Sequence, residues 1–399
     1  MIEDKKPRVI FFDDKETSEG EIAKGLEESF ELQLVSPPPL DKLAELYFSN
    51  GKTPNSFLTD YRLSSGELSN GTSIYYSGTI LLLALREALE KVAPKSGIPL
   101  IAISQYQYFT KEEEMEDIKK IRELADYIIY KEDYLEDSKS TNSKIKSLID
   151  DLPDIYSIEA EKRTWSTLVN LLKPSDFTYV SDLLRNSKPP LADYQIPLDE
   201  RVAKEEKHDK TVSDATSHPA KASWSSRDAT KWIIFTLMEF PGVFIDSLHA
   251  STYLGIDHES FEKSDWIENE FAPAKYRGIF REIDNFWWKY KFLEIAESIM
   301  LENKQDGPLA ENFIETCPSD ASLNQNKCIY SGEPGADKVC YFLKLPTRQE
   351  NALKYLADDR PITMDSAFVS RTAYETTDDT IEELLASSAM RKLEEWYKT

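Results

Sequence analysis

The chain has 399 residues, of which 40% are hydrophobic and 11% aromatic, so it is long enough for two domains with apolar cores. Its formal net charge of -24 argues against a nucleic-acid partner, because nucleic-acid-binding surfaces normally present a basic face. With three cysteines, no apolar signal sequence at its start and no apolar run long enough to cross a bilayer, we expect a cytoplasmic protein without a membrane partner.

Four short apolar segments, each ending in a polar side chain, stand out in the first third of the chain. Helical patterns and one further alternating segment, residues 31–35, separate them. This alternation predicts an α/β domain with a doubly wound, five-stranded parallel sheet of strand order 2-1-3-4-5, whose strands all end at one edge. The polar ends are Asp13 with Asp14 after residues 8–12, Asp60 after residues 55–59, Ser104 after residues 98–103, and Lys131 after residues 126–130.

Two acids, an aspartate, a hydroxyl and a lysine, in this order at strand ends, resemble the receiver domain of two-component response regulators. The resemblance covers about residues 1–150. It implies phosphorylation of an aspartate with the help of Mg²⁺, a hard cation that prefers oxygen ligands. The implied site consists of Asp60 as the phosphoacceptor, of Asp13, Asp14, Asp60 and the backbone carbonyl of Arg62 as Mg²⁺ ligands, and of Ser104 and Lys131 as phosphate-sensing groups.

Each of these residues also has a plainer interpretation. Asp13 and Asp14 could cap a helix that begins near Ser18. Ser104 could be an ordinary hydroxyl at a strand end, and Lys131 a solvated lysine before an acidic run. The receiver interpretation is favoured because it explains all four strand ends together.

Two positions depart from the family pattern. Glu132 stands where receivers usually carry proline, and Ile128 stands where they usually place the aromatic residue that reports phosphorylation. Two tyrosines, Tyr127 and Tyr130, flank that second position. The resemblance therefore implies a complete phosphorylation site that lacks the usual aromatic switch residue.

The rest of the chain carries no family resemblance. Pro153 predicts the end of the last receiver helix, so the receiver domain is expected to span residues 1–152. Residues 153–200 predict a helical connector, and residues 201–226, almost free of apolar side chains, predict a polar linker or mobile loop. Residues 227–399 predict a mainly α-helical output or effector domain with an aromatic-rich core. Residues 328–344 predict a small hairpin in this domain, with Ser331–Gly335 as its turn.

The second half contains two groups of residues whose chemistry bears on function. One is a set of acids and histidines that nuclease chemistry often uses, although such residues are more often a surface feature: Asp246, His249, Asp257 and His258. The other is three cysteines without a Cys-x-x-Cys knuckle, for which we expect no zinc: Cys317, Cys328 and Cys340.

These patterns favour a two-component response regulator that is phosphorylated by a histidine kinase or a phosphotransfer protein. Its output would be non-DNA-binding and would act by protein–protein interaction with its own C-terminal domain, another protein or a second copy of the chain. Activity beyond phosphoryl acceptance and autodephosphorylation is not indicated. The alternatives are a receiver-gated effector enzyme, as in bacterial stress or phage-defence systems, with unknown catalytic residues in the C-terminal half, and a phosphate-independent scaffold.

Overall fold

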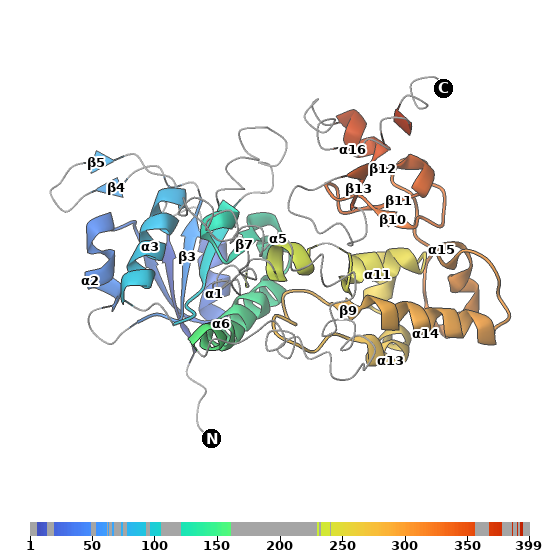
Figure 1. Cartoon of the computed structure of the whole chain (residues 1–399), viewed down its shortest axis with the longest axis horizontal. Coiled ribbons are helices and arrows are strands. Elements are labelled where there is room, and N and C mark those ends of the chain that lie inside the picture. The colour runs from blue at the N-terminus through green and yellow to red at the C-terminus, as the bar shows by residue number, and fades with distance from the viewer. Residues whose placement is uncertain are drawn as a thin grey trace, which may run out of the picture. The chain divides into compact units, whose positions relative to one another are not determined.

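The described residues of the chain, shown in Figure 1 as a computed structural model, fall in two compact units. The first unit comprises residues 6–160 with Thr230, and the second comprises residues 233–393. The structure describes residues 6–13, 20–48, 53–61, 63, 66–67, 73–74, 78–92, 96–104, 121–160, 230, 233–239, 241–355, 367–376, 385, 389 and 392–393.

The first unit is built on a five-stranded parallel sheet of order β2-β1-β3-β6-β7. Counted along the chain, this is the order 2-1-3-4-5 that the sequence predicts, and it is the order of receiver-like folds. A separate two-stranded ribbon, β4 (Gly66–Glu67) with β5 (Ser73–Ile74), lies in the segment between the third and fourth strands. The five sheet strands are β1 (Arg8–Phe12), β2 (Glu31–Val35), β3 (Ser56–Asp60), β6 (Leu100–Ser104) and β7 (Tyr127–Tyr130).

The helices of the first unit gather in two groups, one on each face of the sheet (Figure 1). One group comprises α2 (Leu43–Phe48) and α3 (Gly78–Val92), and the other comprises α1 (Gly20–Ser29), α5 (Lys131–Glu136) and α6 (Ser138–Ala160). Covering both faces buries every residue of β3 and β6, whereas the edge strand β2 is partly exposed. The apolar runs of the sequence are therefore the central strands of the sheet.

The prediction that a helix ends at Pro153 is wrong. The helix α6 continues through this proline to Ala160. The apolar stripe of the helix also continues, from Leu152 on one side of the proline to the equally buried Ile155 on the other. Pro153 packs on Gly97, where an added Cβ atom would lie 2.7 Å from the Pro153 Cα. Burial of the continuing stripe thus outweighs the hydrogen bond that proline removes.

A buried ion pair, which the sequence analysis did not foresee, ties α3 to the loop before β7. The Nη2 atom of Arg86 lies 2.9 Å from Oδ1 of Asp126, and the side chains are 5% and 1% exposed. The same Nη2 donates to the carbonyl of Leu124. The second carboxylate oxygen of Asp126 accepts the backbone N–H of Leu100, the first residue of β6, at 2.8 Å. These contacts fix the amino-terminal edge of the sheet against α3.

The second unit is mostly helical with small hairpin sheets, as the sequence predicts. Its aromatic side chains form a core, in which Phe271 stacks on Phe292 with ring centres 4.3 Å apart. The elements are the π-helical turn Ile233–Leu237, β8 (Phe244–Ile245), α11 (Ser247–Tyr253), α12 (His258–Glu262), α13 (Asp265–Glu270), β9 (Trp287–Trp288), α14 (Lys289–Glu302), α15 (Leu309–Asn312), β10 (Lys338–Val339), β11 (Pro346–Thr347), β12 (Ala352–Tyr355), β13 (Ala367–Ser370) and α16 (Arg371–Thr376).

The predicted hairpin is present but lies later in the chain than the sequence analysis placed it. Residues 328–344 resembled two strands around the turn Ser331–Gly335, yet this turn is flanked only by an isolated bridge between Lys327 and Pro334. The strands that pair are β10 and β11, whose connection begins at Cys340. The glycine- and proline-rich turn therefore precedes the hairpin.

We expect Arg86→Met to lower the free energy of unfolding of the first unit by about 3–5 kcal/mol, because it leaves the Asp126 carboxylate buried without its counter-charge. The control is Lys91→Met on the same helix, whose ion pair with Glu87 is exposed (76% and 60%) and contributes only about 0.3–0.5 kcal/mol. Hydrogen exchange of peptides from β6 and α6 measures this cost. Tryptophan fluorescence would not report on residues 6–160, because all seven tryptophans follow residue 160. Equal costs for the two substitutions would contradict the structural role of the buried pair.

Candidate functional site

The candidate site lies at the edge of the sheet where the parallel strands of the first unit end. Strand register sets which side chains meet there: Phe12 pairs with Thr59, Asp60 with Ile103, and Ser104 with Tyr130. Asp13 and Lys131 directly follow two of these strand-end residues. Because the strands are parallel and in register, residues that are far apart in sequence converge at one edge.

The central contact of the site joins Lys131, the first residue of α5, to Asp60, the last residue of β3. The Nζ atom of Lys131 donates to Oδ2 of Asp60 at 3.1 Å, and the side chains are 11% and 4% exposed. The plainer interpretation, a solvated Lys131, is therefore wrong. A charge-assisted hydrogen bond of this kind offsets part of the cost of desolvating both groups.

Asp13 brings a second buried carboxylate to the same edge. Only 2% of this residue is exposed, and its backbone N–H donates to the carbonyl of Val35 at 3.2 Å, which anchors the end of β1 against β2. Asp14 and Arg62, two of the predicted Mg²⁺ ligands, lie outside the described residues. Among the described residues, no cluster of three or more His, Cys, Asp or Glu side chains is placed to hold a metal ion.

The donor set that is described nevertheless fits Mg²⁺. Asp13 and Asp60 offer carboxylate oxygens, the ligand type that Mg²⁺ prefers, at a buried edge of the sheet. Magnesium usually retains several waters and takes only one or two carboxylates from the protein, together with phosphate oxygens. The two described acids are thus sufficient in number and in kind for such a site.

Ser104 ends β6, the strand that lies between those of Asp60 and Lys131 in the sheet. The residue is buried. Its place between the two ion-paired strands puts a hydroxyl at the site edge, as the sequence analysis expects. Its role toward a phosphate stays a prediction.

Gly78 is a residue that the sequence analysis missed. It is the first residue of α3, and its N–H donates to the carbonyl of Tyr61 at 2.9 Å. An added Cβ would lie 2.4 Å from the carbonyl oxygen of Asp60 and 2.8 Å from the Tyr61 Cα, so the close approach of α3 to the end of β3 requires glycine. The sequence signal that could have found it is a glycine directly before residues 79–92, which have the apolar spacing of a helix.

A hydrogen-bond network holds α5, and with it Lys131, against α1 and α6. The hydroxyl of Tyr134, one turn after Lys131, donates to Oδ1 of Asn142 at 3.2 Å, and burial raises the pKa of this tyrosine above its ordinary value. The Nδ2 of Asn142 donates to the carbonyl of Gly25 and to the Ser29 hydroxyl. The lysine of the site therefore sits on a helix whose position is fixed by two neighbouring helices, α1 and α6.

No protein-family model matches the chain, and no curated protein matches it. Among solved structures, an adenylate cyclase from Rhodopirellula baltica is 15% identical over 40% of this chain and 99% of that chain, with a TM-score of 0.27. A response regulator receiver domain protein from Clostridium thermocellum is 15% identical over 37% of this chain and 94% of that chain, with a TM-score of 0.24. A two-component response regulator from Clostridium difficile is 14% identical over 36% of this chain and 97% of that chain, with a TM-score of 0.24.

These identities and TM-scores assign no function. The strand order of the sheet itself gives residues 6–160 a receiver-like fold. No helix among the described residues is long and apolar enough to cross a membrane.

We expect Gly78→Ala to destabilise the first unit by about 1–3 kcal/mol, because the new methyl group meets backbone atoms that cannot move without displacing the end of β3. The matched control is Gly20→Ala at the start of α1, where nothing lies within 4 Å and alanine should be neutral or stabilising by up to about 1 kcal/mol. Hydrogen exchange of β3 and α6 peptides in both variants measures the difference. Equal stability would mean that α3 does not constrain the end of β3.

Proposed function

We propose that the chain is a response regulator whose first unit accepts a phosphoryl group on Asp60. The observation that carries this proposal is the contact between Lys131 and Asp60 at the sheet edge where Asp13 and Ser104 also lie. An acid that only caps a turn would not need a buried lysine from the helix that follows a strand two places away in the sheet. The receiver-like strand order supports the same conclusion.

In the proposed reaction, a carboxylate oxygen of Asp60 attacks the phosphorus atom of a phosphohistidine or a small acyl phosphate. A new O–P bond forms while the bond from phosphorus to the donor nitrogen or oxygen breaks, and the donor leaves with that electron pair. Lys131 already neutralises Asp60, and its ammonium group would follow the added charge onto the phosphoryl oxygens. Ser104 would donate a hydrogen bond to the phosphoryl group.

The metal in this proposal is Mg²⁺, which would neutralise the charge on the transferring group. Asp13 and Asp60 would hold it, together with Asp14 and the backbone carbonyl of Arg62 as the family resemblance implies. Without the metal, two buried carboxylates share one edge with a single described lysine. Their mutual repulsion favours binding of a divalent cation.

The proposed output is a change in protein–protein contact rather than DNA binding. A net charge of -24 opposes binding to a phosphate backbone. The upstream partner would be a histidine kinase or a phosphotransfer protein, and the downstream partner the second unit, another protein or a second copy of the chain. Ile128, a buried aliphatic residue of β7, stands in the place of the usual aromatic switch residue. The conformational change that follows phosphorylation would instead pass through helix α5, which carries Lys131.

Treatment of the full-length protein with acetyl phosphate and Mg²⁺ should add one phosphoryl group at Asp60, because this carboxylate is held beside Lys131. Intact mass and peptide mapping detect the group. We expect no labelling of Asp60→Asn and wild-type labelling of the control Asp150→Asn, which removes an exposed acid of α6. Label that persists in Asp60→Asn would place the acceptor elsewhere.

Mg²⁺ should raise the melting temperature of the first unit, because a ligand that binds only the folded state stabilises that state. At a free Mg²⁺ concentration of about 100 times the dissociation constant, the gain in the free energy of unfolding is about 2.7 kcal/mol. Thermal unfolding with added Mg²⁺ or with EDTA, followed by hydrogen exchange of first-unit peptides, measures the shift. We expect Asp13→Ala to reduce it, and the same comparison with Asp14→Ala assigns the second acid. If both variants keep the full shift, the acid pair is only a helix cap.

A further inference from the structure

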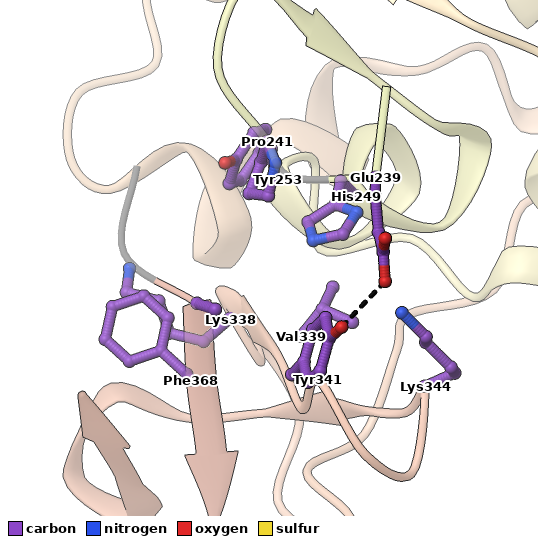
Figure 2. Close-up of a pocket in the computed structure, with 10 residues that line it drawn as sticks. Glu239, Pro241, His249, Tyr253, Lys338, Val339, Tyr341, Lys344 and Phe368 are labelled. Carbon is purple, nitrogen blue, oxygen red and sulfur yellow. Dashed lines mark hydrogen bonds between the residues drawn. The ribbon is translucent and has the colours of Figure 1, made fainter. Parts of the chain in front are cut away.

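A cavity of about 300 Å³ opens in the second unit, at a volume typical of the smaller ligand sites. It lies between α11, the connection that follows β10, and β13, and Figure 2 shows the side chains that face one another across it. Apolar lining comes from residues such as Val339 and Phe368. The polar lining residues are Glu239, His249, Tyr253, Lys338, Tyr341 and Lys344.

The histidine of this cavity is oriented by an aspartate behind it. The Nδ1 atom of His249 lies 2.8 Å from Oδ1 of Asp246, the N-cap of α11, and the same oxygen accepts the backbone N–H of His249 at 2.7 Å. Burial raises the pKa of the Asp246 carboxyl, but the charge of His249, these hydrogen bonds and the charge of Lys344 outweigh burial and lower that pKa to about 2.

This pairing determines which ring nitrogen is available to a ligand. An ionised carboxylate only accepts hydrogen bonds, so Nδ1 of His249 carries the proton. In the neutral ring, Nε2 then presents a lone pair. Because the ring lines the cavity, Nε2 is the atom of His249 that can accept a proton or a hydrogen bond from a ligand.

An ordered acid and a lysine also line the cavity. The hydroxyl of Tyr341 donates to Oε1 of Glu239 at 2.7 Å, drawn as the dashed line in Figure 2. The Nζ of Lys344 lies 4.5 Å from the centre of the Tyr341 ring and, among the described residues, forms no ion pair with a carboxylate. The other lining lysine, Lys338, is bonded to Asp337 at 2.6 Å. Lys344 is therefore the cation that is more available to a ligand.

The second acid–histidine pair of the sequence has a different role. Asp257 caps α12 through a hydrogen bond from the Ser260 N–H at 3.1 Å. The side chain of His258 is 40% exposed and lies 4.0 Å from Glu262. Neither residue lines the cavity. The plain surface interpretation thus holds for this pair, whereas Asp246 and His249 have a cavity in front of them.

We propose that this cavity binds a small anion that also carries a hydroxyl group, with the anionic group at Lys344 and the hydroxyl donating to His249 Nε2. The anionic group is a carboxylate or a phosphate, both of which accept hydrogen bonds from an ammonium. The apolar side chains would cover the carbon skeleton of the ligand. This inference is independent of phosphorylation at Asp60.

The test is a titration of the full-length protein with glycolate and with glycerol 3-phosphate, followed by the imidazole C2–H signals in NMR. The chain has only four histidines, and His249→Gln identifies the signal of interest. We expect a saturable shift of the His249 signal with at least one probe, which also identifies the anionic group, while His258 stays unmoved. Acetate and inorganic phosphate, which lack the alcohol, should bind more weakly.

A matched pair of lysine variants tests the anion contact. Lys344→Gln should weaken binding about tenfold or more, because it removes a charge-assisted hydrogen bond. Lys304→Gln should leave binding unchanged, since Lys304 is also exposed and also has a positive φ (57°, against 49° for Lys344) but does not line the cavity. Three results would overturn the proposal: no saturable shift of His249 with either probe, a shift reproduced by sodium chloride at equal ionic strength, or equal affinity in the two lysine variants.

Discussion

The contact between Lys131 and Asp60 exists only because the sheet of the first unit is complete and in register. Asp60 ends β3 and Lys131 directly follows β7, and β6 lies between these two strands in the sheet. A slip of one residue in either pairing would turn alternate side chains to the other face of the sheet and separate the charges. The site therefore forms with the fold, and a fragment that lacks one of these strands would lose the contact.

Two buried ion pairs lie at opposite edges of this sheet and differ in kind. At the amino-terminal edge, the planar guanidinium of Arg86 forms an ion pair with one oxygen of Asp126 and the backbone N–H of Leu100 donates to the other, so both carboxylate oxygens have partners in fixed positions. At the carboxyl-terminal edge, Asp60 has the ammonium of Lys131, a point charge on a flexible stem. The first arrangement suits a permanent structural contact, and the second suits a charge that can change partners.

The sequence was sufficient to predict the sheet, and which side chains lie at its carboxyl-terminal edge, because both depend on local patterns. Apolar runs gave the strands, and the polar residue at the end of each run gave Asp60, Ser104 and Lys131. The contact between Arg86 and Asp126 could not be predicted, because it joins residues 40 positions apart on elements whose packing the pattern does not specify. Gly78 was missed for the same reason, since its constraint is the backbone of β3.

The second unit shows the limit of local patterns more sharply. Asp246 and His249 are three positions apart on one helical turn, so their pairing could be expected from the sequence. Tyr341 and Lys344 reach the same cavity from about a hundred residues further along the chain, in a region without a recognisable motif. The hairpin was misplaced because a glycine- and proline-rich turn is a stronger sequence signal than two strands of two residues each.

The helix α6 has a geometric consequence for the first unit itself. It follows α5, which begins beside Asp60, and by Pro153 it has reached Gly97, which precedes β6 at the amino-terminal edge. The described part of α6 thus connects the two edges of the sheet. A displacement of α5 at the candidate site would therefore reach the opposite edge through α6, as the motion of a lever.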